Sequence, residues 1–336
     1  MKVNIAYAPD NNFTNLAIVS MVSVLENNKN NEVEFIILYS NLNDSSISAF
    51  DFLKNYDNCK LRFVKVDEEI FKDFPLACWV TVQTWFRTVL GDLCPDLDRI
   101  LYLDCDTLVV GDLAELFSKD LSNNLIAGVT DIVGEESHVK RLEIDDNTYF
   151  NAGVLLFNAK LIREENTFAK IKEYAVGKKL QCADQDAINK VADNQKFLLD
   201  PKYNYLETWE SNYENDYNEK YSKLYAQAKD NPVIIHFVGM KPFFYKNLHS
   251  CKFQWWKYAQ KSNLTVFKER FLEEEKQFDY DIKHFSYLKF FIDFILSKVI
   301  FEKKLRNKFK AKVKSAKDVL NSAKFIEYNA KIKQLF

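Results

Sequence analysis

Short apolar runs alternate with helix-like stretches through most of the chain, and this pattern limits the possible folds. The strand-like runs cover residues 3–8, 33–39, 61–66, 100–103, 124–129, 153–157, 197–199 and 233–238. The helix-like stretches include residues 14–27, 45–56, 80–91 and 159–176. Such alternation predicts an α/β sandwich around a largely parallel sheet. In sheets of this class, ligands bind at the carboxyl ends of the strands.

Two carboxylates lie at one of these predicted strand ends. Asp104 follows the apolar run 100–103, and Asp106 precedes a second apolar run. In an extended segment, residues two apart point to the same side, so both carboxylates are expected to reach one ion. Mg²⁺ and Mn²⁺ take oxygen ligands and are often shared with substrate phosphates. The pair therefore predicts a divalent-metal site for a phosphorylated ligand. Cys105 points to the opposite face and is expected to pack.

Other interpretations of the acidic pair stay open on these residues alone. Asp is common in turns and helix caps. The segment also resembles the first motif of haloacid-dehalogenase-like phosphatases, in which Asp104 would be the nucleophile and Asp106 the acid/base. About a hundred residues of α/β pattern precede the motif, and no Gly-Asp-x-x-x-Asp motif follows it, which disfavours the phosphatase.

The composition restricts the chemistry further. The 336 residues suffice for one large α/β domain and an addition, and 47% apolar with 28% charged residues is usual for a soluble protein. The seven glycines form no phosphate-binding loop, which disfavours a nucleotidyltransferase and leaves charge neutralisation to a metal. The six scattered cysteines predict neither a zinc site nor a disulfide framework. Scattered cysteines favour a reducing, cytoplasmic location. The start of the chain supports the same expectation, because it reads as a strand and not as the apolar core of a signal peptide.

The C-terminal region has a different character. Residues 281–336 contain 14 Lys and Arg against 5 Asp and Glu, a net charge of +9 that leaves −11 for residues 1–280. The segment 285–301 is apolar and aromatic but contains Lys289, Asp293 and Lys298, which disfavours a membrane span. With the basic stretch after it, it predicts a helical tail over 281–336 that binds an anionic membrane surface. The alternative is an ordinary C-terminal helix packed on the body.

Four segments carry a family resemblance. They are Ala-Pro-Asp-Asn-Asn-Phe at 8–13, Arg87 followed by 100–110, Tyr-Phe-Asn-Ala-Gly at 149–153, and Asp-Gln-Asp at 184–186 with Ile-His-Phe-Val-Gly-Met-Lys-Pro-Phe at 235–243. Together they resemble glycosyltransferase family 8, retaining enzymes that include bacterial lipopolysaccharide galactosyl- and glucosyltransferases. The resemblance implies a GT-A fold over residues 1–270. In it, a Rossmann-like nucleotide-binding half, about 1–115, merges with a sugar- and acceptor-binding half, 116–270.

The resemblance also implies roles for individual residues. The metal, Mn²⁺ with Mg²⁺ as the alternative, is expected on Asp104, Asp106 and His236. Around a UDP-sugar donor the resemblance places Ala8, Asp10, Asn12, Phe13, Arg87, Cys105, Gly239 and Lys241. The donor sugar is expected to meet Asp131, Asn151, Asp184 and Gln185. Here one residue separates Gly239 from Lys241, whereas many relatives have one more.

Without the resemblance, the same residues have ordinary structural interpretations. Residues 10–12 read as a helix-capping loop, Asn151 as a turn residue and Asp184 as a helix cap. His236 reads as a packed core residue, and Arg87 as a helix arginine with a surface partner.

The expected activity is retaining transfer of glucose or galactose from a UDP-sugar to a saccharide acceptor. A lipid-linked lipopolysaccharide or lipooligosaccharide core at the inner face of the cytoplasmic membrane is the expected acceptor, and no nucleic-acid partner is expected. Gln185 occupies the position debated as a nucleophile in the family. Because an amide oxygen is a poor nucleophile, same-face attack is preferred over a covalent route. A non-catalytic sugar-nucleotide-binding scaffold is the competing interpretation.

Overall fold

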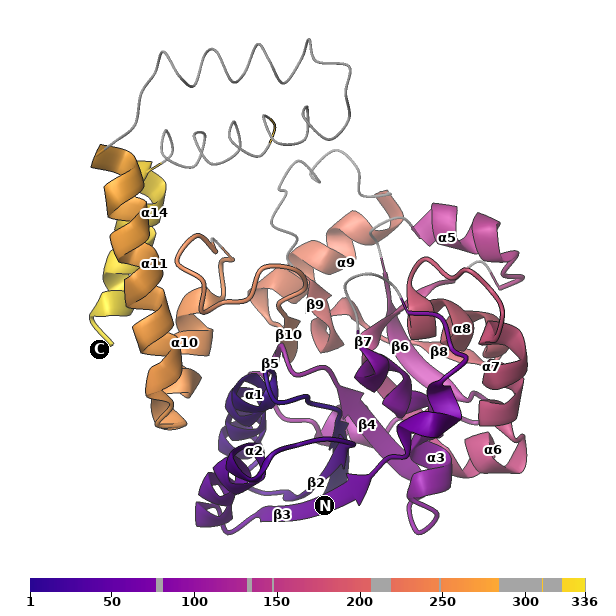
Figure 1. The fold of residues 1–336 in the computed structure, drawn as a ribbon. Coiled ribbons are helices and arrows are strands. Elements are labelled where there is room, and N and C mark those ends of the chain that lie inside the picture. The colour runs from indigo at the N-terminus through magenta and orange to yellow at the C-terminus, as the bar shows by residue number, and fades with distance from the viewer. Residues whose placement is uncertain are drawn as a thin grey trace. The chain divides into compact units, whose positions relative to one another are not determined.

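The structure is a computed structural model that describes two compact units (Figure 1). The described residues are 1–76, 81–131, 135–146, 148–206, 219–247, 249–283, 310 and 322–335. The first unit covers residues 1–238 and the second covers residues 239–336. This division precedes the boundary that the sequence analysis places between residues 270 and 281, which stays a prediction.

A seven-stranded sheet with the order β3-β2-β1-β4-β7-β6-β8 forms the centre of the first unit. Its strands are Lys2–Tyr7 (β1), Glu32–Tyr39 (β2), Cys59–Lys65 (β3), Arg99–Leu103 (β4), Ile126–Thr130 (β6), Phe150–Asn158 (β7) and Lys196–Leu198 (β8). Four neighbouring pairs are parallel, and the two pairs made by β7 are antiparallel. The predicted α/β class with a largely parallel sheet is confirmed, with β7 reversed.

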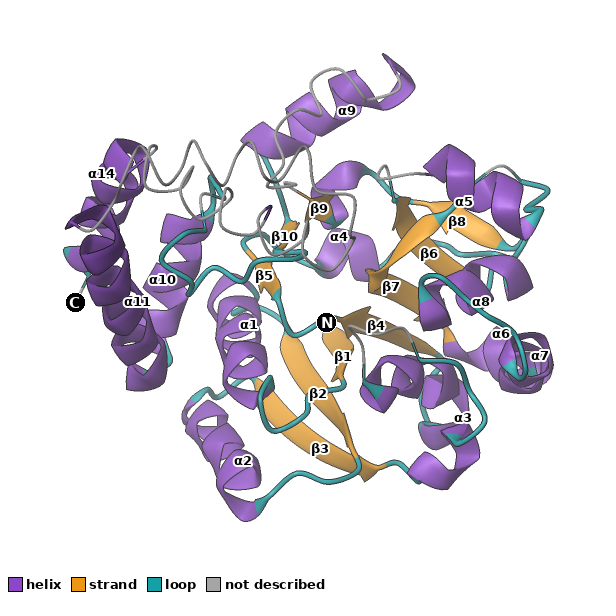
Figure 2. Cartoon of the chain, turned by 45° about the horizontal axis from the view of Figure 1, so that its top comes forward, coloured by secondary structure: helices purple, strands orange, loops and turns teal. Residues whose placement is uncertain are grey.

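The central strands are apolar because both of their faces are covered. Every residue of β1 after Lys2 is buried, and β1 pairs in parallel with β2 from Lys2↔Glu32 to Tyr7↔Ile37. Burial on both faces explains why these strands read as continuous apolar runs and not as alternating ones. Figure 2 shows α1 and α2 at the β2–β3 side of the sheet and α6, α7 and α8 at its other side, where α6 contacts β4 and β7 and α8 contacts β7.

The helices of this unit partly follow the predicted stretches. They are Thr14–Asn27 (α1), Asp44–Ala49 (α2), Leu90–Leu93 (α3), Ala114–Phe117 (α4), Glu135–Leu142 (α5), Ala159–Glu164 (α6), Thr167–Ala175 (α7), Ala183–Val191 (α8) and Glu219–Asp230 (α9). The stretch 45–56 is α2 followed by a 3-10 helix, and 80–91 is mainly the 3-10 helix Val82–Val89. The stretch 159–176 divides into α6 and α7 because Asn166 takes a left-handed conformation with φ of 51°, which asparagine tolerates well.

A small second sheet in the same unit brings distant segments together. It consists of Thr107–Val109 (β5), Ile234–His236 (β10) and Tyr205–Leu206 (β9), in the order β5-β10-β9. Strand β10 pairs antiparallel with β5 and parallel with β9, so His236 lies opposite Thr107. The sequence analysis includes β10 among its strand-like runs but neither β5 nor β9 as a separate strand. This sheet determines which residues can meet Asp104 and Asp106.

The described part of the second unit contains the helices Lys252–Lys261 (α10), Thr265–Lys283 (α11) and Ser322–Lys333 (α14). Aromatic rings from α10 and α11 pack together, with Trp256 edge-on to Phe271. None of the helices in the described part of the chain has the length and apolar character needed to cross a bilayer. The predicted membrane-surface segment 285–301 lies outside the described residues.

Candidate active site

The acidic pair lies in a tight turn between β4 and β5. The backbone N–H of Thr107 donates to the carbonyl of Asp104 at 3.1 Å, and the Thr107 hydroxyl donates to the same carbonyl at 2.8 Å. The backbone N–H of Phe237 donates to the carbonyl of Asp106 at 2.9 Å, which fastens the turn to the end of β10. The expectation of an extended Asp104–Asp106 segment is therefore wrong. The carboxylates converge because the chain turns, not because strand residues alternate.

His236 completes a group of three possible metal ligands with this pair. Its Nε2 lies 3.3 Å from Oδ1 of Asp106 and 3.9 Å from Oδ2 of Asp104. One ligand atom from each residue lies within 4.8 Å of the other two. Two carboxylate oxygens and one imidazole nitrogen suit Mn²⁺ well and Mg²⁺ less so. The side chains that the sequence predicts as metal ligands are thus brought together.

Gly153 in β7 leaves the space that this convergence needs. A Cβ atom at this position would lie 2.1 Å from Cε1 of His236 and 2.8 Å from Oδ2 of Asp104. The backbone N–H of Asp104 also donates to the carbonyl of Gly153 at 2.7 Å. Any side chain at residue 153 would displace the imidazole, the carboxylate or the strand. A glycine here is consistent with a site that gathers ligand atoms around a cation.

Arg87 is buried and links the acidic turn to α8. Its guanidinium lies 3.0 Å from Oδ1 of Asp104 and 3.0 Å from Oδ2 of Asp184, and it also donates to the carbonyl of Ala152. The interpretation of Arg87 as a surface-paired arginine is wrong. Burial alone would lower the pKa of Arg87, but Asp104 and Asp184 outweigh it and raise that pKa.

Asp104 is held so that its two oxygens have different partners. Oδ1 accepts a hydrogen bond from the Tyr102 hydroxyl at 3.0 Å and pairs with Arg87, whose guanidinium also lies 4.3 Å from the Tyr102 ring centre. Oδ2 faces His236. The contacts of Oδ1 with Tyr102 and Arg87 hold the carboxylate in place, and Oδ2 is thereby directed toward His236.

Asp184 belongs to the first turn of α8, but it is not the cap of that helix, which begins after Cys182. Its Oδ1 accepts a hydrogen bond from the Thr84 hydroxyl at 2.6 Å. Burial raises the pKa of Asp184, although Arg87 and Thr84 act in the opposite direction. Asp184 therefore faces the 3-10 helix that carries Arg87.

A cleft of about 200 Å³ opens beside the acidic pair. Its lining combines the loop after β1, the 3-10 helix and the turn: Ala8, Asp10, Phe13, Thr81, Gln83, Thr84, Arg87, Tyr102, Asp104, Cys105 and Asp106. Phe13 is 40% exposed, so its ring is available to a planar ligand. Cys105 is buried against the cleft, and burial raises the pKa of its thiol.

The loop before α1 has a local structural role as well. Oδ1 of Asp10 accepts hydrogen bonds from the backbone N–H groups of Asn12 at 2.8 Å and Phe13 at 2.9 Å. Both donors precede the first helical residue, Thr14, and α1 has no side-chain cap, so Asp10 holds the turn before the helix and the helix-capping interpretation is not confirmed. Asn12 is exposed and does not belong to the cleft lining.

A second set of predicted residues meets at the start of β7. Nε2 of Gln185 donates to Oδ2 of Asp131 at 3.0 Å, and Oε1 of Gln185 accepts from the backbone N–H of Ala152 at 2.9 Å. Asn151 donates to the same Asp131 oxygen at 3.4 Å. Asn151 lies in β7, so its interpretation as a turn residue is wrong. Asp131, Asn151 and Gln185 form one connected polar group.

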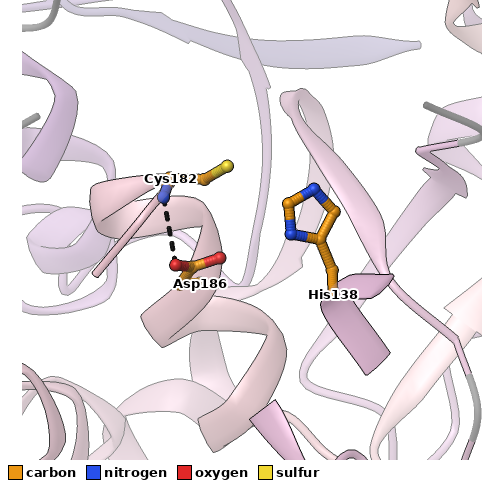
Figure 3. A group of neighbouring side chains, drawn as sticks. All are labelled: His138, Cys182 and Asp186. Carbon is orange, nitrogen blue, oxygen red and sulfur yellow. Dashed lines mark hydrogen bonds between the residues drawn. The ribbon is translucent and has the colours of Figure 1, made fainter. Parts of the chain in front are cut away.

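Figure 3 shows a second group of side chains, His138, Cys182 and Asp186, whose ligand atoms also lie within 4.8 Å of one another. Arg141 already supplies the cation here, with contacts of 2.8 and 3.0 Å to the two Asp186 oxygens. The backbone N–H of Cys182 also donates to Asp186, and Arg141 donates to Nδ1 of His138 at 2.9 Å. This group connects α5 to α8 and does not need a metal.

Two predicted residues fall outside the first unit. Gly239, with φ of +83°, and Lys241 belong to the second unit, so their roles stay predictions. The structure also adds residues that the sequence analysis does not select: Thr84, Tyr102, Gly153 and Asn204. Gly153 and Tyr102 have a sequence signal, since they lie within the quoted motifs 149–153 and 100–110. Thr84 and Asn204 are defined by contacts between distant segments.

Comparisons with known proteins agree with this geometry. The model of glycosyl transferase family 8 matches residues 4–247. Lipopolysaccharide 1,2-glucosyltransferase of Escherichia coli is 30% identical, over 71% of this chain and 73% of that protein. Lipopolysaccharide 1,3-galactosyltransferase of Salmonella typhimurium is 28% identical, over 71% of this chain and 72% of that protein.

Solved structures give the same fold. The crystal structure of galactosyltransferase LgtC, in complex with donor and acceptor sugar analogs, aligns with a TM-score of 0.68 at 25% identity. The alignment covers 77% of this chain and 96% of that one. The chain therefore belongs to glycosyltransferase family 8 and is a hexosyltransferase with a GT-A fold.

Proposed function

We propose that this enzyme transfers glucose or galactose from a UDP-sugar to a saccharide acceptor with retention of anomeric configuration. The observation that carries the proposal is the convergence of Asp104, Asp106 and His236 beside the cleft. Family membership supports the same interpretation, and the phosphatase and the non-catalytic scaffold are not retained.

The proposed metal ligands are Asp104, Asp106 and His236, with Mn²⁺ as the cation and Mg²⁺ as the alternative. Such a cation, when bound, supplies the positive charge that stabilises a departing diphosphate. Arg87 contributes indirectly in this proposal, because its guanidinium is committed to Asp104 and Asp184. It keeps Oδ1 of Asp104 occupied and thereby orients Oδ2.

Of the proposed nucleotide-binding residues, five line the cleft: Ala8, Asp10, Phe13, Arg87 and Cys105. There Phe13 is proposed to stack on the uracil. Asn12, Gly239 and Lys241 do not belong to this lining, and their roles rest on the family resemblance alone. The proposed sugar-binding residues are Asp131, Asn151 and Gln185, which form the polar group at the start of β7. Polar groups that hold sugar hydroxyls discriminate between sugars because a wrong sugar leaves them unpaired. Asp184 is proposed to support this group from α8.

Same-face attack is the proposed route to retention. The bond between the anomeric carbon and the phosphate oxygen breaks, the acceptor oxygen bonds to that carbon on the same face, and its proton passes to the departing phosphate oxygen. The contacts of Gln185 favour this route, because Oε1 already accepts from the backbone N–H of Ala152. An amide oxygen committed in this way is poorly suited to attack carbon. A sugar–Gln185 adduct in a mass spectrum would contradict the proposal.

The test of the function is UDP release from UDP-glucose, UDP-galactose and their N-acetyl forms, with and without Mn²⁺. One hexose donor is expected to turn over only with the metal, and Asp106→Asn is expected to lower the rate by about 100-fold or more. Asp51→Asn is the matched control, since Asp51 is an exposed acid paired with Lys54. Metal-independent turnover, or equal rates for both variants, would refute the proposal.

The acceptor is proposed to be a lipid-linked lipopolysaccharide or lipooligosaccharide core, reached by an enzyme bound peripherally to the inner face of the cytoplasmic membrane. The similarity to the two lipopolysaccharide transferases supports this assignment. The basic, aromatic sequence of 281–336 supports a surface anchor.

The anchor is best tested without deleting the tail, because the second unit includes α14 near the chain end. The test is a triple variant, Lys303→Gln, Lys304→Gln and Arg306→Gln. This variant is expected to lose binding to vesicles with anionic lipid while UDP release continues. The same three changes should have no effect with neutral vesicles. Unchanged binding to anionic vesicles would count against the anchor.

A further inference from the structure

We propose that Asn204 is a positioning residue that holds His236 in the tautomer with hydrogen on Nδ1, which leaves the Nε2 lone pair for the metal. The inference rests on the proposed metal site, and it concerns a residue that does not itself touch the ion. Asn204 is fully buried and lies between a 3-10 helix at 201–203 and β9.

The contact between the two side chains is direct. Oδ1 of Asn204 lies 3.1 Å from Nδ1 of His236. Strand β9 follows Asn204 and pairs in parallel with β10, where Leu206 lies opposite His236. The small sheet therefore holds the backbone beside Asn204 at a fixed distance from His236.

The orientation of the Asn204 amide follows from a backbone group. The N–H of Gly153 donates to the Asn151 side chain at 3.0 Å, so the acceptor there must be the oxygen Oδ1. Asn204 approaches the same oxygen at 3.0 Å and must present its NH₂ group to it. Its other amide atom, which faces His236, is then the oxygen.

An amide oxygen can only accept a hydrogen bond, so the proton between the two side chains belongs to Nδ1 of His236. The neutral imidazole then has its lone pair on Nε2. That atom faces two carboxylate oxygens, 3.3 Å from Asp106 and 3.9 Å from Asp104. Nε2 and the two carboxylate oxygens are three electron-pair donors that face one another, and a cation bound between them would satisfy all three.

The same chain of hydrogen bonds continues to the proposed sugar-binding group. Since Oδ1 of Asn151 is used by Gly153 and Asn204, its NH₂ group faces Oδ2 of Asp131, at 3.4 Å. A hydrogen-bonded line thus runs from His236 through Asn204 and Asn151 to Asp131. The orientation of the imidazole therefore depends on residues of the proposed sugar-binding group as well as on Asn204.

The tautomer can be read without metal or substrate. The chain has four histidines, so a two-bond ¹H–¹⁵N spectrum of the metal-free protein is simple, and His236→Gln assigns the signal. The wild type is expected to show His236 protonated on Nδ1. Asn204→Leu removes the acceptor and is expected to shift His236 away from that form. Asn204→Asp keeps an oxygen acceptor and is expected to retain it.

Metal affinity is the second measurement. In titrations with UDP, followed by the electron paramagnetic resonance of free Mn²⁺, Asn204→Leu is expected to weaken Mn²⁺ binding by about 10- to 100-fold. Asn204→Asp is expected to bind Mn²⁺ more tightly than Asn204→Leu. Asn28→Leu is the matched control, because Asn28 is a buried asparagine of the same unit with hydrogen bonds to Val24 and Leu113.

The outcomes separate this inference from the proposed function. If the wild type fails to bind Mn²⁺ with UDP, the proposed function fails. If the wild type binds Mn²⁺ and Asn204→Leu binds it equally well, or keeps Nδ1 protonated, the role of Asn204 is refuted alone. If Asn28→Leu weakens binding as much as Asn204→Leu, the effect is one of general destabilisation and the inference is also refuted.

Discussion

At the scale of single residues, Gly153 controls how closely β7 approaches the proposed metal ligands. Gly153→Ala places a Cβ atom 2.1 Å from Cε1 of His236, a contact that side chains cannot accept without movement. We expect Mn²⁺ affinity to fall by at least about tenfold, since ligand geometry is disturbed directly. Titration with UDP present measures the effect.

Gly177→Ala is the control for this prediction. Gly177 has φ of +75°, and a Cβ atom added to it would meet no other atom within 4 Å, so alanine strains the backbone without crowding any neighbour. The control should lower stability and leave Mn²⁺ affinity unchanged. If Gly153→Ala binds Mn²⁺ normally, the close approach of the His236 imidazole to the Asp104 carboxylate is not required for metal binding.

Arg87 is a second residue whose contacts predict a measurable effect. Arg87→Met removes the cation between Asp104 and Asp184, and breaking one side of a buried ion pair costs about 3–5 kcal/mol. Denaturant unfolding should show a loss of this size. Asp184→Asn in the same chain should restore part of the loss, because one uncompensated charge disappears. A double variant no more stable than Arg87→Met would contradict this account.

At the scale of elements, the attachment of α5 to α8 should depend on pH. His138 stacks on Tyr149 at 4.5 Å and accepts a hydrogen bond from Arg141. Burial, followed by the charge of Arg141, lowers the pKa of His138, while Asp131 and Asp186 oppose the shift. The folded-state pKa of His138 lies below the unfolded value of about 6.5. The contribution of neutral His138 to stability is therefore complete above that pH and is lost as the pH falls through the lowered pKa.

Hydrogen exchange over α5 measures this dependence. Protection of residues 135–142, corrected for intrinsic rates, should fall between about pH 7.5 and pH 5.5. His138→Gln should remove most of the difference, whereas protection of β1 in the same samples should stay constant. An equal fall in the variant would assign the pH dependence to another group.

The elements also show what the sequence can predict. The helix 14–27 and the strands around 33–39 and 100–103 are recovered because their runs of apolar residues reflect burial. The break at Asn166 escapes prediction because a left-handed residue inside an apolar pattern leaves the periodicity intact. Strand β9 has two residues, too few for any periodic pattern.

The candidate site is also predicted only in part. Asp104, Asp106 and His236 are predicted as a group from a family resemblance, and the structure brings them together. Asn204 and the partners of Arg87 are not predicted, because their roles arise from hydrogen bonds between segments far apart in the chain. Propensity and spacing do not encode such contacts.

At the scale of the whole molecule, the second unit has its own buried polar centre. Lys252 on α10 is fully buried, and its ammonium donates to the carbonyls of Phe244, Tyr245 and Asn247 and to Oδ1 of Asn329 on α14. Burial lowers its pKa to about 7, with Glu274 opposing the shift. One side chain thus joins the segment 244–247 to a helix near the end of the chain.

Lys252→Met should therefore loosen the second unit selectively. Methionine leaves buried carbonyl oxygens without their donor, and each unsatisfied group costs about 1–3 kcal/mol. Hydrogen exchange should accelerate in 249–283 and 322–335, while the strands of the first unit keep their protection. Lys257→Met is the control, because Lys257 is an exposed lysine of the same helix. If exchange in α14 is equally slow in both variants, the Lys252–Asn329 contact does not hold that helix in place.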